Sequence, residues 1–309
     1  MKRLFYIIIA FFVCAAADAA PKFAAPKVVK INERVYALLG PLGMPSKHNQ
    51  GYMVNSTLII GDQGAILVDS GASDEVGSHL AKAIAKLTPK PVTHVVNTHH
   101  HGDHVLGNIV FAGAEIISSE QCREMVNKTG DEWISLMETL VGHKLPNTRA
   151  IPATVTYAGE DTKMERTIQG VRMVFWVPKG SHTVGDMMVY LPDDKVLIGG
   201  DILVNHTIPV MRDAMVRNWA TTLEQAQAFD AKSIVPGHGP LMTKDDVARL
   251  QRQMAAFYAG VEAGYKKGLS DSETRKTLDV AEWKKLEGFE TNIGGNVNRA
   301  YLEAEQASF

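Results

Sequence analysis

Cysteines and long apolar runs are scarce in this chain. Only two cysteines occur in 309 residues, Cys14 and Cys122. Cys14 lies in an N-terminal segment that we expect to be removed, which leaves Cys122 without an intrachain disulfide partner. The long apolar run at 4–13 is shorter than the about 20 residues that a membrane-spanning helix needs. The sequence therefore predicts neither a disulfide framework nor a membrane span.

The chain also lacks an excess of charge of either sign. Lys and Arg number 32, Asp and Glu 34, and the formal net charge is −2. This balance argues against nucleic acid or an anionic membrane as a partner. With 45% hydrophobic and 21% charged residues, the composition favours a globular protein with a sizeable core. We therefore expect a small-molecule substrate, and the sequence assigns no oligomeric state.

The first 19 residues are typical of a signal peptide. Lys2 and Arg3 precede the apolar run, and the small-x-small sequence at 17–19 offers a cleavage site. We expect export to the periplasm or secretion, with no membrane attachment after cleavage. A retained anchor is the alternative. A lipoprotein anchor at Cys14 is disfavoured because the preceding Phe12 and Val13 are bulky.

Metal-binding residues are concentrated in the segment THHHGDH at 98–104. His99 and His101 alternate, so both imidazoles can reach the same side of an extended loop. Gly102 lets the backbone turn, after which Asp103 and His104 can face a neighbouring position. Two metal ions about 3.5–4 Å apart are an arrangement used for hydrolysis. A single closed zinc site, or a surface histidine cluster without metal, is the alternative.

Hydrophobic periodicity indicates an α/β protein with a helical end. A strand at 92–97 runs directly into the histidine loop, a usual site location in layered α/β architectures. Strand-rich sequence occurs before and after about residue 150, which suggests two similar halves packed sheet on sheet. Helices are expected at 73–87 and 222–230, and a loop at 142–158. Thr243 and Asp246 signal the start of an amphipathic helix. We therefore expect a catalytic domain at 20–243 and a helical extension at 244–309.

Three later residues repeat the design of the histidine loop. His182, Asp201 and His238 each follow an apolar run within a loop that contains glycine. Together with the first loop they supply five histidines and two aspartates. This set suffices for two metal sites with three ligands each when one aspartate is shared.

The order THxHxDH, SHT, GGD and PGHG resembles the metallo-β-lactamase superfamily over about residues 28–243. The resemblance implies a four-layer αβ/βα sandwich with the metals at one edge, between the two sheets. It also implies the ligand sets: His99, His101 and His182 for the first metal, Asp103, His104 and His238 for the second, and Asp201 as a bridge.

Two divalent cations would lower the pKa of a shared water to about 7, which makes hydroxide available for attack on a carbonyl-containing bond. Asp103 would orient this hydroxide and accept its proton, and is the expected catalytic residue. We expect a secreted dizinc hydrolase of a β-lactam amide, a lactone or a thioester, with a β-lactamase-like enzyme as the leading interpretation. Iron or manganese would also suit these ligands.

The resemblance has two departures that bear on the substrate. Asp201 stands where the cysteine-containing β-lactamases have cysteine, and in this it resembles glyoxalase II and lactonase-type members. Val204 stands where those β-lactamases have a lysine for the antibiotic's carboxylate. Lys179, Arg212 and Arg217 are candidates to replace that lysine.

Other residues are assigned by their position. Met44 and His48, in a Gly/Pro-rich loop, are candidates for a substrate flap, and His206 for the pocket wall. His100 is expected to point away from the metals, and the four tryptophans to serve in packing. Two other functions stay open. One is an iron-dependent oxidoreductase of the sulfur dioxygenase type, and the other is a non-catalytic periplasmic metal-binding factor.

Overall fold

A computed structural model describes residues 24–308, and the predicted signal peptide lies outside this range. Seven strands form the first sheet, in the order of the sequence. They are β1 (Lys27–Lys30), β2 (Val35–Leu39), β3 (Ser56–Ile60), β4 (Ala65–Val68), β5 (Val92–Val96), β6 (Glu115–Ser119) and β7 (Val155–Tyr157). The first four strands are antiparallel, and β4 to β7 are parallel to one another.

Five strands form the second sheet, in the order β12-β11-β10-β9-β8. They are β8 (Thr162–Ile168), β9 (Val171–Val177), β10 (Met188–Leu191), β11 (Val196–Ile198) and β12 (Ser233–Val235). Strands β8 to β11 are antiparallel neighbours, and β12 is parallel to β11. The carboxyl ends of β9, β11 and β12 therefore lie at the same end of this sheet.

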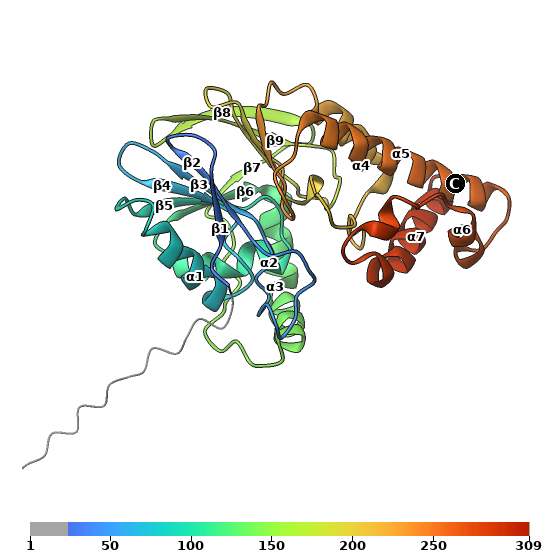
Figure 1. Cartoon of the computed structure of the whole chain (residues 1–309), viewed down its shortest axis with the longest axis horizontal. Helices are drawn as coiled ribbons and strands as arrows, with labels where there is room; N and C mark the ends of the chain where they lie inside the picture. The colour runs from blue at the N-terminus through green and yellow to red at the C-terminus, as the bar shows by residue number, and fades with distance from the viewer. Residues whose placement is uncertain (1–23, 309) are drawn as a thin grey trace, which may run out of the picture.

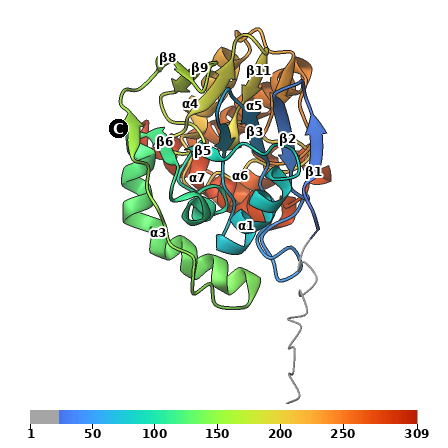
Figure 2. The ribbon, with the colours of Figure 1, turned by 90° about the vertical axis from the view of Figure 1, so that its left-hand side faces the viewer.

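The two sheets pack face to face, with helices on both outer faces. Apolar side chains of both sheets, such as Ile66 and Phe175, form the core between them. Helices α1 (Asp74–Ile84) and α3 (Glu120–Val141) pack on the outer face of the first sheet, and α4 (Val216–Ala226) and α5 (Lys244–Lys266) on that of the second. Figures 1 and 2 show these helices on opposite sides of the strands. The predicted four-layer αβ/βα sandwich is confirmed.

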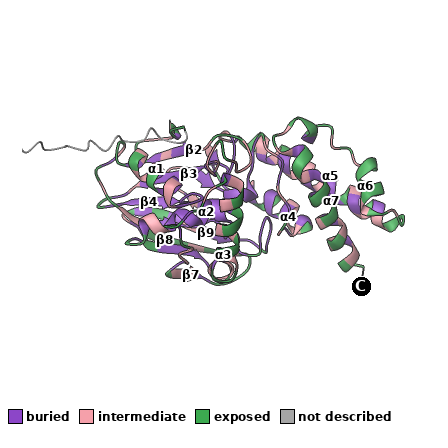
Figure 3. Cartoon of the chain, turned by 90° about the horizontal axis from the view of Figure 1, so that it is seen from below, coloured by how far each residue is buried: buried purple, intermediate pink, exposed green. Residues whose placement is uncertain are grey.

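The C-terminal region is helical, as predicted. It contains α5, α6 (Asp271–Thr277) and α7 (Phe289–Gln306). These helices share one apolar core with α4 and the second sheet, for example through Met254 and Val297. In Figure 3 buried residues continue from the strands into α5 and α7. The extension is therefore built onto the sandwich.

Local start signals place two helices. Ser73 caps α1 by accepting a hydrogen bond from the Val76 N–H, and Thr243 and Asp246 form a reciprocal capping box at α5. The prediction was wrong for α4, which spans Val216–Ala226 and begins six residues earlier than expected. It also missed strand β7 inside the expected loop. Within residues 24–308, no helix combines the length and apolar character needed to cross a membrane.

Candidate metal centre

Four loops meet where the two sheets end. The histidine loop leaves β5, and it includes the single helical turn α2 (Gly102–Val105). His182 lies in the loop after β9, Asp201 in a short 3-10 helix after β11, and His238 directly after β12. These positions follow from strand direction, because β9, β11 and β12 end on the same side of their sheet. The fold thus brings together all seven residues of the predicted ligand set.

Close backbone approach fixes the relative position of two loops. The N–H of Gly237 donates to the Gly200 carbonyl at 2.8 Å. A Cβ atom at Gly237 would lie 2.0 Å from Asp201 Oδ1, so a larger residue would displace the Asp201 carboxylate. Asn55 adds a link from the first sheet, since its Nδ2 donates to the carbonyls of Pro236 and Gly239.

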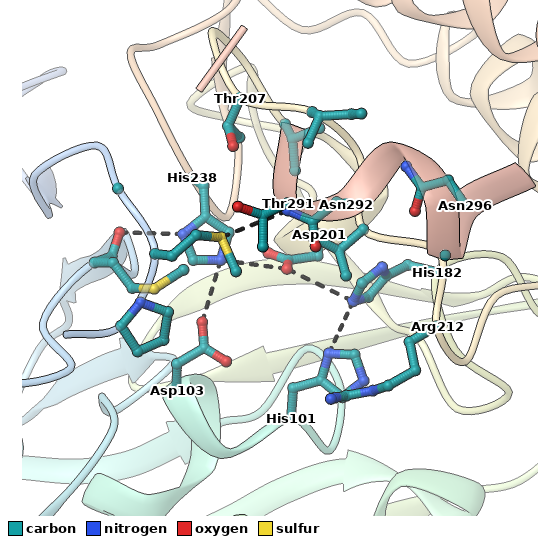
Figure 4. A pocket seen from close by; sticks show the side chains of 18 of the residues that line it. His101, Asp103, His182, Asp201, Thr207, Arg212, His238, Thr291, Asn292 and Asn296 are labelled. Carbon is teal, nitrogen blue, oxygen red and sulfur yellow. Dashed lines mark hydrogen bonds and ion pairs between the residues drawn. The ribbon is translucent and has the colours of Figure 1, made fainter. Parts of the chain in front are cut away.

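The seven side chains fall into two adjoining groups. In each group the ligand atoms lie within 4.8 Å of one another: His99, His101, His182 and Asp201 in one, and Asp103, His104 and His238 in the other. Asp201 lies between them, because its Oδ2 is 3.6 Å from His182 Nε2 and its Oδ1 is 3.2 Å from His104 Nε2. Figure 4 shows Asp201 between His182 and His238, with His101 and Asp103 opposite.

Three of the histidines are oriented by partners outside the cluster. His104 Nδ1 bonds to Asp69 Oδ2 at 2.8 Å, and His101 Nε2 to Asp213 Oδ2 at 2.9 Å. His238 Nδ1 lies 3.1 Å from the Met53 carbonyl. Each partner accepts a hydrogen bond from one ring nitrogen, so that the other ring nitrogen faces the centre. Such outer hydrogen bonds fix the tautomer that a metal ligand needs.

Burial shapes the charge of the cluster. Burial first, and then the charges of neighbouring histidines, lower the pKa of His99 well below its ordinary value and that of His182 to about 3. Burial by itself would raise the pKa of Asp103 and Asp201. The charges of nearby histidines outweigh it and hold both pKa values well below their usual range. The imidazoles of His99 and His182 are therefore neutral, and both carboxylates are ionised.

His104 and His238 respond in the opposite direction. Burial by itself would lower the pKa of each, but the carboxylates, Asp201 first, attract the protonated form. The pKa of His238 consequently rises to about 10, and that of His104 lies well above its ordinary value. Without metal, protons on these two rings balance the carboxylates. A bound cation would replace those protons.

The side chains fit a divalent cation. His99 Nε2 is buried without a hydrogen-bond partner, 4.0 Å from Asp201 Oδ2. Buried polar atoms without partners are costly, and metal coordination would satisfy them. Imidazole nitrogen and carboxylate oxygen are ligands for zinc, and they also accept iron or manganese.

A cavity of about 620 Å³ opens onto the cluster. His101, Asp103, His182, Asp201 and His238 lie at its floor (Figure 4). Of the three predicted pocket residues, Met44 lines the cavity. His48 and His206 are exposed on the surface and are not part of this lining. His100 is buried beside His101 and is not among the residues that line the cavity. With His101 and Asp213 it forms a further group of possible ligand atoms within 4.8 Å of one another.

Two residues beside His101 were missed by sequence reasoning. Trp133 was expected only to pack, but its ring lies 4.8 Å from that of His101 and lines the cavity. Asp213, the partner of His101 Nε2, lies 112 residues away in the sequence. No local pattern marks either residue. Arg212 lies over the Trp133 ring at 4.5 Å and also lines the cavity, whereas Lys179 and Arg217 are not among its lining residues.

Helix α7 holds the segment that carries Arg212 and Asp213. Asn296 accepts from the Met211 N–H and donates to the Pro209 carbonyl, at 3.0 and 2.8 Å. One turn later, Arg299 Nε donates to the Ala214 carbonyl at 2.7 Å. A further turn on, the Glu303 carboxylate accepts from the N–H groups of Val216 and Arg217. The C-terminal extension is therefore part of the support of the metal centre.

A buried His/Asp cluster at the end of an αβ/βα sandwich defines a class of metal-binding proteins. The chain belongs to the metallo-beta-lactamase superfamily, whose family model matches residues 49–238. Members of this superfamily are mostly metal-dependent hydrolases, β-lactamases and sulfatases among them. The predicted family membership is therefore confirmed.

Three known proteins show how far the similarity extends. A linear primary-alkylsulfatase from Pseudomonas sp. is 26% identical, over 65% of this chain and 45% of its own length. This chain thus spans less than half of that relative. The structure of a metallo-beta-lactamase from Pontibacter korlensis matches with a TM-score of 0.60 at 22% identity, over 74% of this chain and 99% of its own. That of a sec-alkylsulfatase from Pseudomonas sp. has a TM-score of 0.68 at 17% identity, covering 89% and 50%.

Proposed function

We propose that this chain is a secreted dizinc hydrolase that cleaves a carbonyl-containing bond in a small molecule. The observation that carries the proposal is the convergence of seven buried His and Asp side chains, five of which lie at the floor of an open cavity. Membership of a superfamily composed mostly of metal-dependent hydrolases supports it. A β-lactam amide, a lactone and a thioester are the candidate substrates, with a β-lactamase-like activity first.

The chain's own residues have distinct tasks in this proposal. His99, His101 and His182 would hold one zinc ion. Asp103, His104 and His238 would hold the second, and Asp201 lies between the two groups. When bound, the two cations polarise a substrate oxygen and lower the pKa of a coordinated water to about 7. Asp103 lies at the cavity floor, and its contacts with His104 and His238 both use Oδ2. Its Oδ1 would accept the proton of the attacking water.

Arg212 is the side chain best placed to bind a negatively charged group of the substrate. Of the three cationic candidates named from the sequence, it alone lines the cavity. Its guanidinium lies against Trp133 and beside Asp213, which limits its rotamers. A guanidinium held in this way binds carboxylate or sulfate oxygens with little further ordering.

A sulfate ester is a second candidate substrate, favoured by the C-terminal helices. The alkylsulfatase structure matches 89% of the 309 residues, which is more than residues 1–243 contain. The match therefore includes part of the C-terminal extension at 244–309. The β-lactamase structure matches 74% of the chain. Since α7 supports the cavity wall, a shared extension favours a shared type of substrate site. Because the sequence identity to the alkylsulfatase structure is low, its similarity bears on the fold alone. The 26% identity to a linear primary-alkylsulfatase is a separate observation in favour of a sulfate ester.

The test begins with metal content. The purified mature protein is analysed by mass spectrometry, and we expect two zinc ions per chain. It is then assayed with a β-lactam, a lactone, a thioester, an alkyl sulfate and a phosphodiester. Turnover of one of the first three supports the leading proposal, and turnover of the sulfate alone supports the second. One iron per chain with oxygen consumption would identify an oxidoreductase, and a loaded but inactive protein would identify a binding factor.

Export is tested separately. Cell fractionation of the full chain should recover a mature protein in the periplasm or medium, with its N-terminus near residue 20. A chain that keeps residues 1–19 and sediments with membranes would contradict export in soluble form.

A further inference from the structure

Exposed apolar side chains gather at the mouth of the cavity. Among the residues that the structure describes, five large apolar side chains are exposed: Val28, Leu42, Leu136, Val184 and Leu302. Three of these, Leu42, Leu136 and Leu302, line the cavity. They come from the 41–45 loop, from α3 and from α7, which are distant in sequence. Single exposed leucines are ordinary, but three that converge on one opening indicate a binding surface.

The apolar surface continues inward from the mouth. Met44, Met53, Trp133, Met137 and Leu140 also line the cavity. Several of these are methionines, whose unbranched side chains adapt to ligands of varied shape. A cavity of about 620 Å³ is within the usual range for small-molecule sites.

Three polar side chains in the α7 part of the wall bond to backbone carbonyls of the protein. Asn296 uses both ends of its amide on the backbone of the 209–211 segment. Asn292 Nδ2 donates to the Gly288 carbonyl at 2.9 Å, and Arg299 Nε to the Ala214 carbonyl. Figure 4 shows Asn292 and Asn296 on α7, across the cavity from His101 and Asp103. These contacts hold α7 as one wall of the cavity.

We propose that this cavity binds substrates in which an apolar chain adjoins the hydrolysable group. The group lies at the metal centre, and the chain runs outward along α3 to the leucines at the mouth. Helix α7 completes the chain-binding wall through Leu302, so the C-terminal extension determines specificity. The inference rests on the proposed hydrolase function and names the substrate class of the same site. An acyl ester, an acyl thioester and an alkyl sulfate share this chemistry.

Chain length is the variable to test. The metal-loaded full chain is assayed with p-nitrophenyl esters, N-acetylcysteamine thioesters and alkyl sulfates, each with chains of two to ten carbons. Burying a methylene contributes up to about fourfold in kcat/KM, so we expect a steep rise within at least one series. Hydrolysis with equal kcat/KM for two and ten carbons in every active series would overturn the inference and leave the hydrolase proposal intact.

Variants locate the chain site. In Leu136→Ser/Leu302→Ser, the ratio of kcat/KM for ten carbons to that for two should fall about tenfold. The matched control is Val28→Ser, which changes an apolar side chain of similar exposure, 41%, on β1 outside the cavity. It should keep the ratio. If the double variant keeps the ratio and instead changes the oligomeric state, the leucines form a protein interface and the inference is wrong.

Binding without turnover separates the two proposals. Calorimetry with decanoate and acetate on the metal-loaded protein should show at least tenfold tighter binding of decanoate, and a loss of this preference in the double variant. If that result is obtained and no series is hydrolysed, the chain site stands and the hydrolase proposal fails. Equal affinity for the two acids would overturn the chain site.

Discussion

Replacing Asp213 tests whether the metal centre depends on a residue outside the ligand set. His101 Nε2 donates to Asp213 Oδ2 at 2.9 Å, while His101 Nδ1 lies 3.0 Å from His182 Nε2 at the centre. Asp213→Ala removes the acceptor that holds the ring in this tautomer. Loss of such an outer partner costs about 10–100-fold in metal affinity, or roughly 1.4–2.7 kcal/mol.

The same change should have little effect on folding. The Asp213 side chain is 39% exposed, and its ion pair with Arg212 is therefore screened by solvent. We expect the metal-free variant to lose less than about 1 kcal/mol of unfolding free energy. Zinc affinity is measured by competition with a chromophoric chelator, and stability by urea unfolding of the metal-free protein. Asp213→Asn, which keeps an oxygen acceptor, should recover part of the affinity.

Asp193→Ala is the matched control for this experiment. Asp193 is an exposed aspartate that pairs with Arg172 at 2.7 Å on the surface of the second sheet. Its removal should leave both zinc affinities unchanged. If Asp213→Ala binds zinc within twofold of the parent, or loses no more than Asp193→Ala, the proposed orienting role of Asp213 is wrong.

Three further predictions follow from the same contacts. Asp103→Ala should lower kcat by about 10²–10⁴-fold at saturating zinc while far-UV circular dichroism is unchanged, and a variant with most of its activity would contradict the proton-accepting role. Glu303→Ala should destabilise the protein by about 1–2 kcal/mol in urea unfolding, because the first turn of α4 loses its acceptor, and Glu303→Gln should lose less. Zinc affinity should rise with pH between 6 and 8, because the pKa values of His104 and His238 are raised and zinc must displace their protons. The plot of the logarithm of the zinc association constant against pH should have a slope between about one and two. A flat plot would refute protonation of these rings.

The metal centre could be predicted from the sequence because its signals are local or ordered along the chain. Alternation of His99 and His101 in one loop is visible without a structure. His182, Asp201 and His238 each follow an apolar strand, and the ends of these strands meet in the fold. The helix starts at Ser73 and Thr243 were predictable for the same reason, since a cap and its backbone donor are three residues apart.

The start of α4 shows where local signals run out. Met215 precedes the helix and makes no side-chain cap, so the sequence near 216 carries no start signal. The cap is the carboxylate of Glu303, 87 residues further along the chain. His48 and His206 show the converse, since their positions in the sequence favoured them for the pocket, whereas in the structure both are exposed outside the cavity lining.

The sequence by itself determined the fold class and the family of this protein, and it predicted which His and Asp side chains cluster, because strand periodicity and metal-ligand spacing are patterns of a few neighbouring residues. Only the tertiary structure decided what surrounds those ligands. Asp213 lies 112 residues from His101 in the sequence, and Asn296 of α7 holds Met211 from 85 residues away. Trp133 is nearer in the sequence, but only the packing of α3 brings its ring beside His101. Such contacts depend on how the layers pack against one another, and this packing produces no periodic pattern of residues in the sequence.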